Sequence, residues 1–196
     1  MIHTIGDSHA KIPWEKISNT SINWLGPKLM YTFGKIGTNL IDIKDIKLSA
    51  NDTLIFCFGE IDCRCQVYKF DFLNSYKIVI DRLVEKYIKT ILAIKNNIDV
   101  QCNIYIYNVI PPIRKTIGSE NSQYPFLGND EQRKKYTTYM NFLLKKKCNS
   151  KGLLFFDIYD KYCDRDGFLE PTLSDYICHI NDPNYIVQYL EEIDAE

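Results

Sequence analysis

The chain has 196 residues, of which 45% are hydrophobic and 25% are charged, and its formal net charge at pH 7 is -1. This length suits one α/β domain with a well-buried core and leaves too little chain for two. Balanced charge gives no overall attraction to polyanions or to lipid headgroups, so we expect neither nucleic acid nor a membrane as a partner.

The N-terminal residues lack the basic region and the apolar core of a signal peptide, and no apolar run approaches the roughly 18 residues of a spanning helix. We therefore expect a cytoplasmic protein. The seven cysteines are an odd number scattered through predicted strands and helices, which predicts reduced thiols. Cys63 and Cys65 lack the spacing of a zinc knuckle and the chain has only three histidines, so no metal site is expected.

Apolar runs and helical periodicities alternate along the chain. After a short helix within 10–17, we expect the segment 41–48 to be a half-exposed strand or an irregular edge, and Gly34 and Gly37 to end the helix before it. Strands are expected at 2–5, 21–25, 53–58, 100–110 and 153–158, and helices at 27–33, 76–92, 129–147 and 184–193. With right-handed crossovers, this alternation predicts an α/β fold: a three-layer α/β/α sandwich with a central parallel sheet.

Ser8 lies where the first predicted strand ends, in the sequence Gly6-Asp7-Ser8-His9. The carboxyl edge of an open parallel sheet is where such folds bind ligands, so Ser8 is a candidate nucleophile. The same four residues also suit an ordinary capped turn, with glycine for the bend and Asp or Ser as the cap.

Gly26 follows the second predicted strand. Its backbone N–H can point into the crevice, or the glycine can simply allow a tight turn into a helix. Asn108, at the end of a later strand, is a further candidate. Loops as long as 114–128 are often lids or binding elements, so we expect substrate contacts there.

The segment Gly59-Glu60-Ile61-Asp62-Cys63-Arg64 directly follows the most apolar predicted strand. Ionisable groups at this place are costly unless they are paired or face the crevice. Two interpretations stay open: an acidic residue paired with Arg64 to pin a loop, or a functional role for Gly59, Glu60, Asp62 and Arg64.

These corners, followed by Asp175 and His179 near the C-terminus, resemble in order and spacing the SGNH (GDSL-type) hydrolase family. The resemblance implies a flavodoxin-like sandwich in which Ser8 is the nucleophile, His179 its general base and Asp175 the carboxylate that orients the imidazole. It also implies that the backbone N–H groups of Ser8 and Gly26 bind the oxyanion. The segments Gly6–Ala10 and Gly59–Arg64 resemble a subgroup associated with glycan-modifying machinery.

Two positions depart from the family pattern. Ile61 stands where the family has an asparagine that donates to the oxyanion, so we expect Arg64, or else Asn108, to replace it. Asp175 and His179 are four residues apart where the family has three. His179 could therefore be oriented by a backbone carbonyl or by Asp182.

The resemblance implies a Ser8-dependent acyl-transfer enzyme that acts on a sugar, a nucleotide-sugar or a glycan through an acyl-serine intermediate. We favour a sugar acetyltransferase with acetyl-CoA as the acyl donor and no permanently bound cofactor. The alternatives are a carbohydrate acetylesterase and a non-catalytic glycan-binding domain, which the missing asparagine favours. The Asp182-Pro183 end and the acidic tail 191–196 could lead into another domain of a longer glycan-modifying chain.

Overall fold

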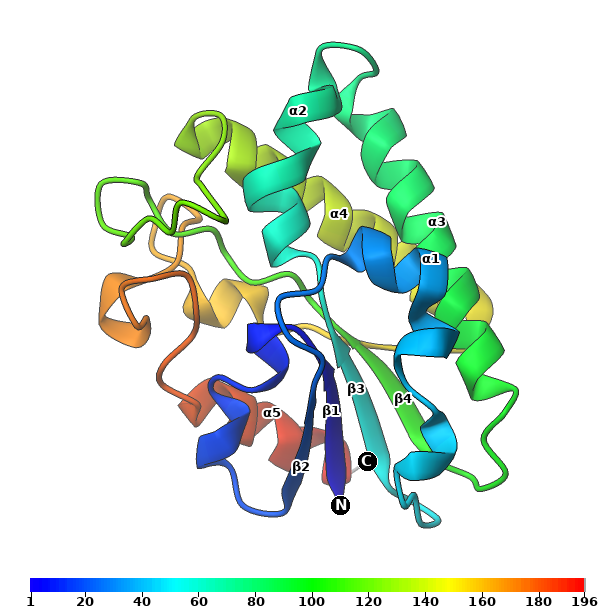
Figure 1. Cartoon of the computed structure of the whole chain (residues 1–196). Helices are drawn as coiled ribbons and strands as arrows, with labels where there is room; N and C mark the ends of the chain where they lie inside the picture. The colour runs from blue at the N-terminus through cyan, green and yellow to red at the C-terminus, as the bar shows by residue number, and fades with distance from the viewer. Residues whose placement is uncertain (196) are drawn as a thin grey trace.

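Five parallel strands form the central sheet, in the order β2-β1-β3-β4-β5 (Figure 1). The computed structural model describes residues 1–195. The strands are β1 (Ile2–Gly6), β2 (Thr20–Trp24), β3 (Thr53–Cys57), β4 (Asn103–Tyr107) and β5 (Leu154–Phe156). All five residues of β3 are buried, as a continuously apolar strand in the middle of a sheet requires.

Helices cover both faces of the sheet, which confirms the predicted α/β/α sandwich (Figure 1). One core cluster joins the sheet to α1, α3 and α4, and the other joins it to α5 and to the segment around Trp14. The helices are α1 (Met30–Leu40), α2 (Val67–Asp71), α3 (Tyr76–Lys95), α4 (Asp130–Lys151) and α5 (Asn184–Asp194). None of the helices within residues 1–195 combines the length and apolarity that crossing a bilayer demands.

The clearest sequence signals give helices close to their predicted bounds. The apolar stripe of α3 is buried from Ile80 to Ile94, as its three- and four-residue spacing predicts. Asn129 caps α4 in a reciprocal capping box with Gln132, and Gly152 ends the helix in the left-handed conformation.

The prediction that Gly34 and Gly37 end the first helix is confirmed in part: α1 continues to Leu40, but it is kinked at Ile36, between the two glycines, where the backbone is not helical (φ -137°, ψ 19°). A Cβ at Gly34 would lie 3.0 Å from the backbone nitrogen of Tyr87 on α3. Thr90 of α3 also donates a hydrogen bond to the Gly34 carbonyl, at 2.9 Å. These glycines therefore let α1 and α3 approach closely, a function that chain position alone does not distinguish from helix termination.

Three further segments have structure that the sequence predicted only loosely or not at all. The segment 41–48 contains a 3-10 turn, Ile43–Asp45, so the expected irregular edge is confirmed and the alternative of a strand is wrong. The expected short helix near Trp14 is the 3-10 turn Trp14–Lys16. A π-helical turn, Asp62–Gln66, and the short helix α2 follow β3 where no helix was expected. Segments this short carry too few residues for periodicity to reveal them.

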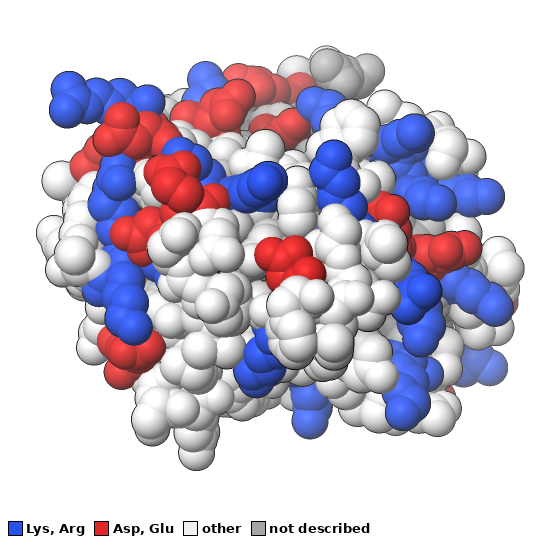
Figure 2. All heavy atoms as spheres, turned by 90° about the horizontal axis from the view of Figure 1, so that it is seen from above, with Lys and Arg blue, Asp and Glu red and all other residues white. Residues whose placement is uncertain are grey.

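The strand register brings three chain reversals to one edge of the sheet. Gly6, the last residue of β1, is aligned with Trp24 of β2 and with Cys57 of β3. Ser8, Gly26 and Gly59 thus occupy equivalent positions just past the ends of these strands. Figure 2 views this end of the molecule, where acidic and basic side chains are interspersed with uncharged surface.

Candidate functional site

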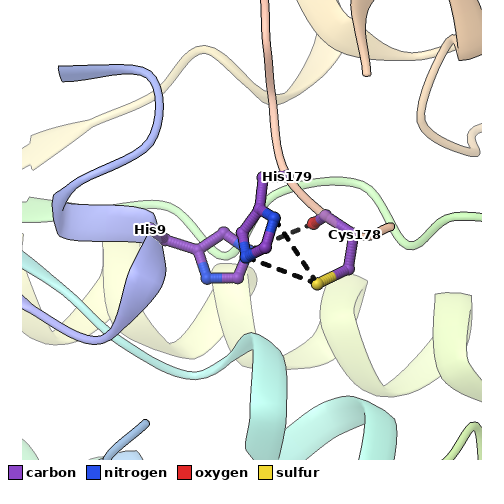
Figure 3. A group of neighbouring side chains, drawn as sticks. All are labelled: His9, Cys178 and His179. Atoms are coloured by element: carbon purple, nitrogen blue, oxygen red, sulfur yellow. Dashed lines mark hydrogen bonds between the residues drawn. The ribbon is translucent and has the colours of Figure 1, made fainter. Parts of the chain in front are cut away.

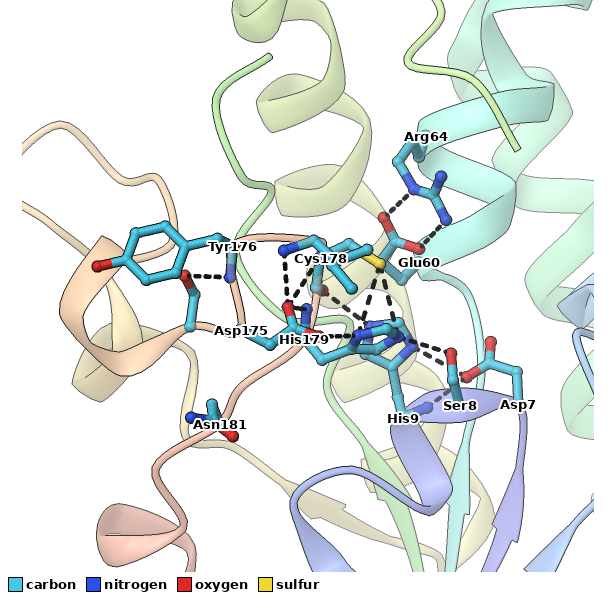
Figure 4. Close-up of polar contacts among 12 residues, drawn as sticks. Asp7, Ser8, His9, Glu60, Arg64, Asp175, Tyr176, Cys178, His179 and Asn181 are labelled. Carbon is cyan, nitrogen blue, oxygen red and sulfur yellow. Dashed lines mark hydrogen bonds and ion pairs between the residues drawn. The ribbon is translucent and has the colours of Figure 1, made fainter. Parts of the chain in front are cut away.

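Ser8, His179 and Asp175 form a connected series of hydroxyl, imidazole and carboxylate (Figure 4). Ser8 Oγ lies 2.8 Å from His179 Nε2, and His179 Nδ1 lies 2.5 Å from Asp175 Oδ2. Ser8 begins the 3-10 turn that follows β1, and His179 lies on the loop that leads to α5. In this arrangement the imidazole can accept the hydroxyl proton at one nitrogen while the carboxylate holds the other.

The loop around Asp175 is folded about its own carboxylate. Oδ1 accepts backbone N–H bonds from Ile177, Cys178 and His179 at 2.8, 3.0 and 3.0 Å, which leaves Oδ2 for the imidazole. Burial opposes ionisation of Asp175, but the hydrogen bonds from the side chain and backbone of His179 hold its pKa well below the usual value. Asp182 instead accepts hydrogen bonds from Asn184, so the alternative that Asp182 orients His179 is wrong.

Ser8 and Gly26 also present backbone N–H groups at this edge. Within residues 1–195, no protein hydrogen bond engages either N–H group. Gly26 has a φ of 78°, in the left-handed region that glycine tolerates best, and the space around its Cα is open. Both groups are therefore available to bind an anionic oxygen near Ser8.

Glu60 and Arg64 form a buried, two-pronged ion pair. Arg64 Nε donates to Glu60 Oε1 at 2.6 Å and Nη2 donates to Oε2 at 3.0 Å. Nη1 donates to the Tyr124 carbonyl, and the Arg64 carbonyl accepts the N–H of Leu127 at 3.0 Å. Arg64 thus pins the loop 114–128, and the expectation that its guanidinium replaces the missing oxyanion donor is corrected.

Asp62 and Gly59 shape the backbone around the site. The Asp62 carboxylate accepts the N–H groups of Met30 and Tyr31, at 2.6 and 3.2 Å, and so caps α1. Burial raises the pKa of Asp62 to about 7 despite these bonds. Gly59 has a φ of 115°, and a Cβ there would lie 2.7 Å from Val109.

Asn108 joins the ends of two strands. Its Oδ1 accepts the N–H of Ile158 at 2.9 Å, and its Nδ2 donates to the Val109 carbonyl at 3.0 Å. The side chain is almost fully buried. The expectation that Asn108 serves as a second substitute for the asparagine absent at Ile61 is therefore corrected as well.

Sequence reasoning did not identify His9 as part of the site. Its Nδ1 lies 2.9 Å from Asp7 Oδ1 and its Nε2 lies 3.1 Å from the carbonyl oxygen of Cys178. The rings of His9 and His179 have centroids 4.8 Å apart. The available signal was its position directly after Ser8, at the same edge of the sheet.

His9, Cys178 and His179 gather their potential ligand atoms within 4.8 Å of one another (Figure 3). Both nitrogens of each imidazole already have hydrogen-bond partners, and burial raises the pKa of the Cys178 thiol well above its usual value. Because a metal needs free imidazole nitrogens and a thiolate, this cluster is poorly suited to hold one.

No family model and no curated protein matches the sequence. Solved structures that share its fold include a GDSL-like lipase from Bacteroides thetaiotaomicron, with 10% identity, a TM-score of 0.64 and coverage of 98% of this chain and 86% of that chain. Phospholipase A1 from Streptomyces albidoflavus has 11% identity and a TM-score of 0.54, covering 99% and 98%. The aryl esterase of M. smegmatis has 12% identity and a TM-score of 0.56, covering 99% and 98%. The chain therefore has the fold of GDSL-type lipolytic hydrolases.

Proposed function

We propose that the chain is a serine-dependent acyl-transfer enzyme of the SGNH hydrolase type, with Ser8 as nucleophile, His179 as general base and Asp175 as its orienting carboxylate. The observation that carries this proposal is the Ser8–His179–Asp175 series, with distances of 2.8 and 2.5 Å. A serine hydroxyl is a weak nucleophile until a base takes its proton, and this geometry supplies that base.

In the reaction that we propose, Ser8 Oγ attacks the carbonyl carbon of an ester or a thioester while His179 Nε2 takes the hydroxyl proton. The tetrahedral intermediate collapses, and His179 returns the proton to the leaving oxygen or sulfur, which leaves an acyl-Ser8 ester. An acceptor hydroxyl then attacks this ester, with His179 again taking the proton. The released product is the acid when the acceptor is water and a new ester when the acceptor is another hydroxyl, and Ser8 is regenerated.

The N–H groups of Ser8 and Gly26 would bind the oxyanion of each tetrahedral intermediate. In known enzymes one such donor contributes on the order of 3 kcal/mol to transition-state stabilisation. A third donor is missing, because the side chain of Ile61 has no group that can donate a hydrogen bond. We therefore expect slower turnover than in an enzyme with three donors.

Water is the acceptor that the structural neighbours favour, since they include a lipase, a phospholipase and an aryl esterase. A sugar hydroxyl as acceptor, with acetyl-CoA as donor, is the second candidate. It rests on the resemblance of Gly6–Ala10 and Gly59–Arg64 to a glycan-modifying subgroup. Both reactions pass through the same acyl-Ser8 intermediate.

A fluorophosphonate probe tests the shared step. We expect covalent labelling of Ser8 in the wild-type chain, no labelling in Ser8→Ala and much slower labelling in His179→Ala. Ser150→Ala is a matched control, because Ser150 is exposed on α4 and its hydroxyl donates to the Lys147 carbonyl. An unlabelled Ser8 in folded wild-type protein would overturn the proposal and favour a glycan-binding domain.

The acceptor is identified with two substrates. Hydrolysis of an aryl acetate without any added acceptor indicates an esterase. Release of free CoA from acetyl-CoA only in the presence of a sugar indicates the acetyltransferase. Either activity supports the proposal only if the Ser8→Ala variant lacks it.

A further inference from the structure

His9 lies between the nucleophile turn and the His179 loop, and both of its ring nitrogens face oxygen atoms that accept hydrogen bonds. Nδ1 is 2.9 Å from Asp7 Oδ1, and Nε2 is 3.1 Å from the carbonyl oxygen of Cys178. A neutral imidazole carries one N–H, so beside an ionised carboxylate it can satisfy only one of these oxygens. An imidazolium donates to both.

The charges around His9 favour the imidazolium. Asp7 is fully buried, its Oδ2 has no hydrogen-bond partner, and among residues 1–195 its ion-pair partner is His9. An ionised carboxylate removed from water needs such a positive partner. Burial by itself lowers the pKa of His9, but the Asp7 carboxylate and then Glu60 raise it above the usual value. Glu60 is in turn paired with Arg64.

We propose that His9 is a positioning residue which, as a buried imidazolium, ties the Cys178 carbonyl to Asp7 and so fixes the His179 ring beside Ser8. The Cys178 carbonyl belongs to the peptide that joins Cys178 to His179, so its anchor acts directly on the backbone of the base. The two imidazole rings also pack against each other, with 46° between their planes (Figures 3 and 4). The role of His179 in this inference rests on the proposed function.

This link connects residues of the two sequence motifs in space. His9 belongs to the motif around Ser8, and Glu60 and Arg64 belong to the motif after β3. Asp7, His9, Glu60 and Arg64 form a buried series of alternating charge. The series joins the ends of β1 and β3 to the loop that carries His179.

The link depends on pH. The titratable groups that face His9 are Asp7 from the turn after β1, Glu60 from the turn after β3, and the Cys178 thiol and His179 from the C-terminal loop. When His9 loses a proton, the remaining one stays toward the Asp7 carboxylate, which is the stronger acceptor. Nε2 then presents a lone pair to the Cys178 carbonyl. The link is therefore present near neutral pH and is lost as the pH rises through the raised pKa of His9.

The protonation state is measured by long-range ¹H–¹⁵N correlation spectra of the imidazole rings. At pH 7 we expect the His9 ring to carry a proton on each nitrogen, and we expect these signals to be absent in His9→Gln. A His9 ring whose Nδ1 is unprotonated at pH 7, with the proton on Asp7, would overturn the inference. This readout does not depend on catalysis.

The positioning role is measured by the rate of fluorophosphonate labelling of Ser8 between pH 6 and pH 10. The wild-type rate should fall at high pH with the midpoint at which the His9 ring titrates by NMR. His9→Gln keeps an amide donor that does not titrate, so it should lack this basic limb. His9→Leu has no donor and should be slower by roughly 10- to 100-fold at pH 7, as expected for a misplaced base.

His3→Gln is the matched control, since His3 is a buried histidine of β1, the strand before the turn that carries His9, and is paired with Asp52 at the other end of the sheet. It should keep the wild-type pH profile. A basic limb that persists in His9→Gln would overturn the positioning role. If wild-type protein is never labelled, the proposed function fails. The inference is then tested by hydrogen exchange of the backbone amides of Cys178 and His179. Exchange in His9→Leu at the wild-type rate would overturn the inference.

Discussion

Asp175 reaches His179 across a spacing of four residues, with 2.5 Å between Oδ2 and Nδ1. The spacing works because the intervening loop folds around the carboxylate. The backbone N–H groups of Ile177, Cys178 and His179 all point at Oδ1. One residue thus shapes the loop with one oxygen and orients the imidazole with the other.

Asp175→Asn should lower the rate of Ser8 labelling on the order of 10³- to 10⁴-fold. The amide can present its N–H₂ group to His179 Nδ1, which favours the tautomer that cannot accept a proton from Ser8. The labelling rate at pH 7 is the measurement, and circular dichroism reports whether the loop variant stays folded. Asp182→Asn is the control and should label at the wild-type rate. Equal rates for the two variants would contradict the role that we assign to Asp175.

The Asp175 carboxylate should also make stability depend on pH. Its pKa is lower in the folded chain than in the unfolded one, so its contribution to stability is present above the unfolded value and is lost as the pH falls toward the folded one. Denaturant unfolding between pH 3 and pH 7 measures this. Wild-type protein should lose more stability on acidification than Asp175→Asn. Equal losses in the two proteins would contradict a contribution of the Asp175 carboxylate to stability.

Glu60→Gln should lower the free energy of unfolding by about 3–5 kcal/mol, because it leaves Arg64 buried without its charged partner. The loop 114–128 should become more susceptible to proteolysis, since Arg64 bonds the Tyr124 carbonyl. Urea unfolding and limited trypsin digestion are the measurements. Glu131→Gln, in an exposed pair with Lys134, should cost about 0–1 kcal/mol. A similar small effect at Glu60 would show that the buried pair does not stabilise the fold.

The sequence predicts most of the sheet but little of the network of hydrogen bonds and ion pairs beneath the site. The apolar residues of β3 and the stripe of α3 are local patterns, and burial of each follows from its own spacing. The contact between His9 and Cys178 joins residues 169 positions apart, and nothing local distinguishes this histidine from a capping residue. Arg64 is a different case, because the sequence marks it as a candidate but does not assign its role. A charged residue directly after a buried strand can pin a loop or act in the site, and only its partners in the structure decide between the two.

Asn108→Ala should separate a structural role from a catalytic one. The substitution leaves the N–H of Ile158 without its partner in a buried place, which costs about 1–3 kcal/mol of unfolding free energy. The rate of Ser8 labelling in the folded variant should remain within about twofold of the wild-type rate, because the Asn108 amide points to backbone groups of its own strand end and of Ile158. Thermal unfolding and labelling are measured on the same sample. A large loss of labelling without a loss of stability would restore Asn108 as an oxyanion donor.

Asp62→Asn should remove a pH dependence of stability that the wild-type chain has near neutrality. Burial raises the pKa of Asp62 to about 7, above its value of 3.8 in the unfolded chain, so the folded chain binds the proton more tightly. Stability from this carboxyl is therefore greatest at low pH and falls as the pH rises to about 7, at roughly 1 kcal/mol per pH unit. Asparagine does not ionise, and its carbonyl can still accept the Met30 N–H.

The difference between the unfolding free energies of wild-type protein and Asp62→Asn should thus change steadily from pH 5 to pH 7 and become constant above about pH 8. Asp42→Asn provides the comparison, because Asp42 is an exposed cap of a 3-10 turn. A slope that appeared equally in Asp42→Asn would not be attributable to the Asp62 carboxyl. Parallel stability curves for wild type and Asp62→Asn would mean that the two N–H bonds at the start of α1 keep the carboxylate ionised throughout.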